Sequence, residues 1–198
     1  MRAKDRALYI ALTAVCLAPL LLALTRVGDW TLIGQDRWVA LTGRWAMRLL
    51  VLALAITPLA RALRRRWLIR CRRVIGLTAF AYASLHLGSY VVIDQVWRAP
   101  QMLVTRTYLL LGTLAWLLLI PMAATSSNAA VRRLGGDAWK RLHRAIHLVA
   151  PLAAGHFLLA SNGGAPAEAV LESAAIVLLL AGRMLRRRRR EAAGSVSR

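Results

Sequence analysis

Apolar blocks about 20 residues long dominate this chain and restrict what it can fold into. A block of this length crosses the roughly 30 Å hydrocarbon core of a bilayer as a helix. The blocks show no period-two alternation, and only helices or closed barrels satisfy every backbone polar group in lipid. We therefore expect an all-α integral membrane protein with six transmembrane helices, at residues 8–24, 43–59, 74–93, 107–124, 138–160 and 167–185.

The expected helices belong to a single membrane domain over residues 1–190, and residues 191–198 are predicted to form a disordered tail. Pro58 is expected to mark the end of the second helix, because proline disrupts a helix interior. The first block follows the basic segment MRAKDR, as a signal peptide would. It is long and has no convincing cleavage site, so we interpret it as a retained helix.

Positive charge gathers at the ends of the apolar blocks. The net charge is +20, and 22 of the 28 Lys and Arg residues lie at the N-terminus, in 61–73, in 131–144 and from residue 183 onward. This pattern is typical of cytoplasmic loops under the positive-inside rule. We therefore expect both termini in the cytoplasm, a lipid bilayer as partner and no nucleic acid.

The two cysteines restrict the redox chemistry of the chain. Cys16 lies in an apolar block and Cys71 in a basic segment, so they differ in depth and should not form a disulfide. The sequence has no CxxCH motif, which excludes covalent attachment of c-type haem.

Two histidines lie inside apolar helices and are the principal candidates for function. At about 1.5 Å per residue, His86 lies about 12 Å below Asp94, and His156 lies about 9 Å below Asn162. A buried imidazole needs a partner. Either both rings bind one haem iron between facing helices, or they are satisfied by each other or by a backbone carbonyl.

The other two histidines allow several roles. His143 lies 13 residues before His156 and about 140° away around an ideal helix, although Pro151 between them can change this rotation. His143 is a candidate ligand of a second haem, or an interfacial residue that binds a headgroup, a flavin or a partner. His147 lies one turn from His143 and is either a ligand or its polar neighbour.

Arg44 and Arg48 lie one turn apart at the start of the second helix, and each has two interpretations. They either extend toward the headgroups or pair with a haem propionate, so both are candidate cofactor-binding residues. Tyr82 and Ser84 lie near His86 in sequence and either orient it or pack between helices.

Three segments resemble the MsrQ (YedZ) family of the ferric-reductase-like transmembrane superfamily. RRVIGLTAFAYASLHLGSYVVID resembles the third helix of that family, and TGRWAMRLLVLALAITPLARALRRR resembles its second. The segment that runs from TRTYLLLGTLAW to PLAAGHF is similar to its fourth and fifth helices. The resemblance covers about residues 40–160, including His86, His143 and His156.

The resemblance implies a haem-binding membrane subunit in the bacterial inner membrane. It implies b-type haem, one or two per chain, with His86, His143 and His156 as the carried-over ligands. Electrons would come from a cytoplasmic flavin reductase or from quinol, and would pass to a periplasmic molybdopterin-containing methionine sulfoxide reductase. FMN is implied by the resemblance only, because the sequence has no flavin motif.

Two other functional classes remain open at this point. A ferric or quinol reductase on the same scaffold would need a different electron acceptor. A small transporter would use the histidines in a proton or metal path, and it should also have acidic residues within the membrane. The acidic residues lie at block boundaries or in the tail, which disfavours the transporter. In the favoured interpretation the chain transfers electrons and does not itself reduce the final substrate.

Overall fold

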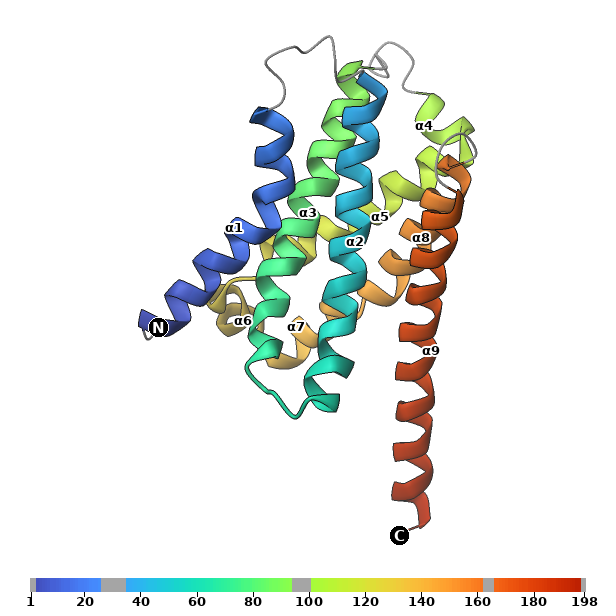
Figure 1. The fold of residues 1–198 in the computed structure, drawn as a ribbon. Coiled ribbons are helices and arrows are strands. Elements are labelled where there is room, and N and C mark those ends of the chain that lie inside the picture. The colour runs from blue at the N-terminus through green and yellow to red at the C-terminus, as the bar shows by residue number, and fades with distance from the viewer. Residues whose placement is uncertain (1–2, 26–34, 94–100, 162–165, 197–198) are drawn as a thin grey trace.

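The computed structural model describes residues 3–25, 35–93, 101–161 and 166–196. Asp94 and Asn162, which served as depth markers for the histidines, lie outside these residues. The described residues form helices and no strand (Figure 1). The helices are α1 (Ala3–Thr25), α2 (Gln35–Ala62), α3 (Leu68–Ile93), α4 (Met102–Thr105), α5 (Thr107–Ala124), α6 (Asn128–Leu134), α7 (Gly136–His143), α8 (Ile146–Ala160) and α9 (Pro166–Val196).

The length and composition of these helices confirm an α-helical membrane protein. Four stretches are long and apolar enough to cross a bilayer: Arg37–Ala62, Leu68–Val92, Thr107–Ala124 and Gly136–Ala160. A shorter apolar helix spans Ala7–Leu22. The bounds of α5 equal those predicted for the fourth helix. The helices α2 and α3 start earlier than predicted, because polar residues extend them beyond the apolar blocks.

Pro58 lies inside α2, so the prediction that it ends the helix is wrong. Proline has no N–H to donate to the carbonyl four residues earlier, which is that of Leu54. Arg183 of α9 donates from Nη2 to this carbonyl oxygen at 2.7 Å. The guanidinium therefore replaces the missing helix bond, and α2 continues to Ala62.

The predicted fifth helix is divided into α7 and α8. Residues 144–145 separate them, and the N–H groups of Arg144, Ala145 and His147 each bond a carbonyl three residues earlier. Such bonds are typical of a tightened 3₁₀ turn. Pro151 cannot donate to the carbonyl of His147, which weakens the helix just after this turn.

The last helix continues further than the sequence suggested. The predicted disordered tail begins at residue 191, whereas α9 extends to Val196. Ala192 and Ala193 favour a helical continuation because alanine has the highest helix propensity. The C-terminal part of α9 extends beyond the other helices in Figure 1.

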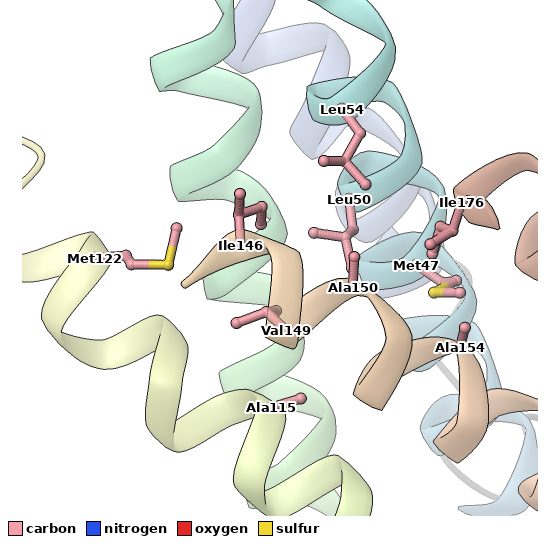
Figure 2. Packing of buried hydrophobic residues seen from close by; sticks show 10 residues of the cluster. All are labelled: Met47, Leu50, Leu54, Ala115, Met122, Ile146, Val149, Ala150, Ala154 and Ile176. Atoms are coloured by element: carbon pink, nitrogen blue, oxygen red, sulfur yellow. The ribbon is translucent and has the colours of Figure 1, made fainter. Parts of the chain in front are cut away.

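The helix α2 lies at the centre of the bundle and packs on two sides. One side contributes Met47, Leu50 and Leu54 to a cluster with α5, α8 and α9 (Figure 2). The other side contributes Leu49, Ala53 and Ile56 to a cluster with α1 and α3. In lipid, helices associate through close van der Waals packing, which small residues such as those of α8 permit. The members from α8 and α9 are Ile146, Val149, Ala150, Ala154 and Ile176.

Tyr82 attaches α1 to α3. Its hydroxyl accepts a hydrogen bond from the N–H of Leu20 at 3.2 Å and donates to the carbonyl of Cys16 at 3.1 Å. These two backbone groups would bond each other in an ideal helix. The hydroxyl is thus inserted into the α1 ladder beside Pro19, at a kind of site where helices bend. Tyr82 therefore acts in helix packing and does not orient His86.

Candidate functional site

A cavity of about 350 Å³ lies between α2, α3, α5 and α8. Its wall is mainly apolar, as in most sites that hold a small organic ligand. The cavity lies at the end of the bundle where α2 starts and α3 ends, and we call this end the pocket end. The lining includes Val39, Met47, Ala83, Leu87, Leu109, Trp116, Ala153 and Phe157.

The structure brings His86 and His156 together in this cavity. His86 comes from α3 and His156 from α8, and their ring centroids are 5.9 Å apart with 72° between the ring planes. Both residues line the cavity. The similar depth predicted for the two histidines is therefore matched by their proximity in space.

A backbone carbonyl holds each of these imidazoles. Nδ1 of His86 is 2.9 Å from the carbonyl oxygen of Val39, and Nδ1 of His156 is 2.7 Å from that of Tyr108. A carbonyl oxygen only accepts, so Nδ1 is the protonated nitrogen in both rings. Nε2 then keeps its lone pair, the state in which a neutral imidazole binds a metal. No hydrogen bond to either Nε2 is found among the described residues.

A glycine makes room for each ring. A Cβ atom on Gly43 would lie 2.9 Å from Cε1 of His86, and one on Gly112 would lie 2.7 Å from Nδ1 of His156. Both distances are shorter than real Cβ contacts, so a larger residue would displace the ring. Sequence reasoning missed both glycines. The available signal was a lone glycine inside an apolar helix, where alanine is favoured by about 1 kcal/mol.

His86 and His156 are held in the same way, each by a glycine and a carbonyl of one neighbouring helix. Val39 lies four residues before Gly43 in α2, and Tyr108 lies four residues before Gly112 in α5. In each helix a histidine from a neighbouring helix lies over the glycine and bonds the carbonyl one turn earlier. The rings are thus oriented by backbone on α2 and on α5.

Ser84 supports the cavity wall and does not contact His86 through a hydrogen bond. Its hydroxyl oxygen accepts from Nε1 of Trp116 at 2.9 Å. Trp116 also stacks on Phe80, with ring centroids 6.4 Å apart and 16° between the planes. Ser84 therefore fixes an aromatic side of the cavity, in agreement with the helix-packing interpretation.

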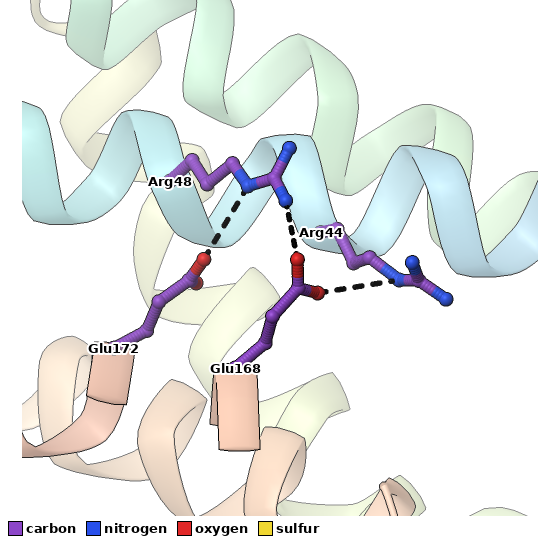
Figure 3. A network of polar contacts seen from close by, with 4 residues as sticks. All are labelled: Arg44, Arg48, Glu168 and Glu172. Atoms are coloured by element: carbon purple, nitrogen blue, oxygen red, sulfur yellow. Dashed lines mark hydrogen bonds and ion pairs between the residues drawn. The ribbon is translucent and has the colours of Figure 1, made fainter. Parts of the chain in front are cut away.

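Arg44 and Arg48 pair with two carboxylates of α9 (Figure 3). Nη2 of Arg48 lies 2.7 Å from Glu168, and its Nε lies 3.5 Å from Glu172. Nε of Arg44 lies 3.7 Å from Glu168. Glu168 and Glu172 are one turn apart, as are the arginines, and this matched spacing was an unused sequence signal. Arg44 also lines the cavity, whereas Arg48 does not.

The structure does not bring His143 or His147 to the pair in the cavity. His143 stacks on Trp139 with ring centroids 4.0 Å apart, and its Nδ1 is 3.1 Å from the carbonyl oxygen of Trp139. The side chain of His147 is exposed. Neither histidine lines the cavity.

Comparison with known proteins identifies the family. The family model described as "Ferric reductase like transmembrane component" matches residues 42–154. A haem-binding subunit MsrQ of protein-methionine-sulfoxide reductase from Caulobacter vibrioides is 41% identical over 164 residues, covering 79% of this chain and 77% of that protein. The chain belongs to the MsrQ family.

Two further relatives match this chain over a shorter region. The MsrQ protein of Azospira oryzae is 42% identical over 132 residues, which cover 64% of this chain and 57% of that protein. The magnetosome protein MamZ of Magnetospirillum gryphiswaldense is 42% identical over 123 residues, which are only 19% of its length. The MsrQ-like region therefore also occurs within a much longer protein.

Proposed function

We propose that this MsrQ-family chain is a haem-binding electron-transfer subunit, and that His86 and His156 would hold one b-type haem. The observation that carries the proposal is the imidazole pair in the cavity, in which each Nδ1 donates to a carbonyl. The haem-binding names of the relatives support the same cofactor.

The described residues fit this group, and each has a physical task. Val39 and Tyr108 orient the rings through their carbonyls, while Gly43 and Gly112 leave space for them. The apolar wall excludes water from the ligand nitrogens. When bound, haem supplies reversible one-electron chemistry at its iron.

Arg44 is the better candidate for a haem propionate. It lines the cavity, and its contact with Glu168 is 1 Å longer than that of Arg48 (3.7 against 2.7 Å). Arg48 is instead held by both Glu168 and Glu172. His143 stacks on Trp139 and does not line the cavity, so we do not assign it a second haem.

The expected topology completes the proposal. We propose six spans, with α1 and α9 added to the four long apolar stretches, and both termini in the cytoplasm of a bacterial inner membrane. The distribution of Lys and Arg supports this orientation. The pocket end then faces the periplasm.

The electron route follows from family membership and topology. We propose that electrons enter from a cytoplasmic flavin reductase or the quinone pool and leave to a periplasmic molybdopterin-containing methionine sulfoxide reductase. The names of the relatives support a methionine sulfoxide reductase as the electron acceptor. FMN binding remains a prediction from the resemblance.

The absorption spectrum of the purified protein tests the cofactor assignment. We expect the bands of low-spin b haem in the wild type, and their loss in His86→Ala and in His156→Ala. His147→Ala is the control and should keep the bands, because His147 lies outside the cavity. A colourless wild type from cells with ample haem would contradict the proposal.

The electron acceptor separates the main proposal from the ferric-reductase alternative. Reduced protein in proteoliposomes should transfer electrons to the purified periplasmic reductase and not to a ferric chelate. Rapid oxidation by the chelate alone would instead favour a ferric reductase on this scaffold.

A further inference from the structure

Thr42 lies beside the backbone carbonyl that holds His86. It belongs to α2 and is completely buried, although it does not line the cavity. Its hydroxyl is 3.0 Å from the carbonyl oxygen of Trp38 and also 3.0 Å from that of Val39. A hydroxyl has one proton to donate, so these two oxygens compete for it. The link between Thr42 and His86 is therefore the carbonyl of Val39.

Three donors compete for this carbonyl oxygen of Val39. Nδ1 of His86 lies 2.9 Å from it, and in a regular helix the N–H of Gly43 donates to it as well. The hydroxyl of Thr42 is the third donor, whereas a carbonyl oxygen has two lone pairs. A hydrogen bond from Thr42 to Val39 therefore weakens the bond that His86 makes to the same oxygen.

The corresponding position in α5, one residue before its glycine, differs in chemistry. It holds Leu111, whose side chain has no hydroxyl. Nδ1 of His156 is 2.7 Å from the carbonyl oxygen of Tyr108, whereas Nδ1 of His86 is 2.9 Å from that of Val39. The two imidazoles are thus held by the same kind of bond, but the acceptor of His86 is shared with a threonine.

We propose that Thr42 is a positioning residue that raises the reduction potential of haem in the cavity by acting on His86 through Val39. This inference rests on the proposed haem site. An imidazole that donates strongly from Nδ1 is a more basic ligand through Nε2, and a more basic ligand favours ferric over ferrous iron. Because Thr42 competes for the acceptor, it lowers the basicity of His86 and favours the ferrous state.

The midpoint potential of the haem-loaded, full-length protein tests this role. Thr42→Val replaces the hydroxyl by a methyl group of similar size, so the potential should fall. At a fixed electrode potential we expect the ratio of ferric to ferrous haem to rise about threefold, which corresponds to roughly 28 mV at 59 mV per tenfold change. Thr42→Ser keeps a hydroxyl at the same position and should keep the potential of the wild type.

Thr78→Val is the matched control for the loss of a buried hydroxyl. Thr78 is a buried threonine of α3, and its hydroxyl donates to the carbonyl oxygen of Val74 one turn earlier at 2.9 Å. The carbonyls that hold the two cavity histidines are those of Val39 and Tyr108, so Thr78 acts on neither of them. The potential of Thr78→Val should therefore equal that of the wild type.

Thr42→Ala removes the same hydroxyl and keeps the test valid if Thr42→Val misfolds. A lower potential in either variant, with the haem bands retained, supports the proposal. An unchanged potential in both, an equal fall in Thr78→Val, or the same fall in Thr42→Ser would overturn it. Loss of haem from both Thr42→Val and Thr42→Ala would also overturn it, because the hydroxyl would then be needed for the fold. A wild type without haem would instead contradict the haem site itself.

Discussion

The two ends of the bundle use histidine and arginine in different ways. At the pocket end His86 and His156 bond backbone carbonyls, and Arg44 and Arg48 are matched by two glutamates of α9. At the other end His143 stacks on Trp139, and Arg183 donates to the carbonyl oxygen of Leu54. Neutral, fixed side chains suit a buried cofactor, whereas an arginine bonded to a carbonyl supports the helix around a proline. A single residue type therefore gains its role from what surrounds it.

The largest expected effect comes from filling the space beside a ring at the pocket end. Gly112→Ala should displace His156, because the new Cβ would lie 2.7 Å from Nδ1. We expect the loss of most bound haem, measured as the ratio of haem to protein. The controls are Gly76→Ala and Gly88→Ala, since a Cβ at either position meets nothing within 4 Å.

The two control variants should be slightly more stable than the wild type. Replacing a helical glycine by alanine stabilises a helix by about 0.5–1 kcal/mol when space is available. If Gly112→Ala retained full haem, the ring would not depend on the close approach of α5, and the difference between the two ends would be weaker than we infer.

The next largest effect is a loss of stability when a glutamate of the pocket end is neutralised. Glu168→Gln should release Arg44 and weaken the hold on Arg48, whereas Glu172→Gln should weaken only the hold on Arg48. We expect a lower thermal stability, by about 1 kcal/mol for Glu168→Gln and less for Glu172→Gln. The measurement is a thermal melt of the haem-loaded protein at low and high salt, and salt should reduce the difference. Equal melts of the two variants would contradict a shared role of Glu168.

A smaller effect is expected at His143, and it sharpens the contrast with the cavity pair. His143→Ala removes the stack on Trp139 and the hydrogen bond to the carbonyl of Trp139, so stability should fall by about 1 kcal/mol. The ratio of haem to protein should not change. A loss of about half the haem would instead reveal a second haem site at this residue.

The smallest loss of stability is expected from a change at the contact between α1 and α3, away from both ends. Tyr82→Phe removes the hydroxyl that joins the N–H of Leu20 to the carbonyl of Cys16. These groups can then bond each other, so the free energy of unfolding should fall by about 1 kcal/mol or less. Faster proteolysis within α1, with an unchanged haem spectrum, would show that the hydroxyl only attaches this helix.

Sequence patterns predicted the helices and the histidine pair for simple reasons. Apolar length determines whether a segment can span lipid, and this placed α5 at residues 107–124. Counting residues from the boundaries was enough to predict a similar depth for His86 and His156, because a helix rises uniformly.

Other features depend on contacts between helices and could not be read from single segments. The break at 144–145 and the passage of Pro58 through α2 depend on hydrogen bonds that form only after folding. The roles of Gly43 and Gly112 require knowing which ring lies above each glycine. The pairing of Arg44 and Arg48 with α9 requires the packing of two helices that are about 120 residues apart in sequence.

The carbonyl bonds to Nδ1 have a consequence for assembly of the holoprotein. Val39 and Tyr108 orient the imidazoles through bonds within the chain itself, which do not require a cofactor. Less side-chain freedom is then lost on capture, which favours tight binding to a pre-formed receptor. On the proposed haem assignment, cofactor loading would therefore require no refolding around His86 and His156.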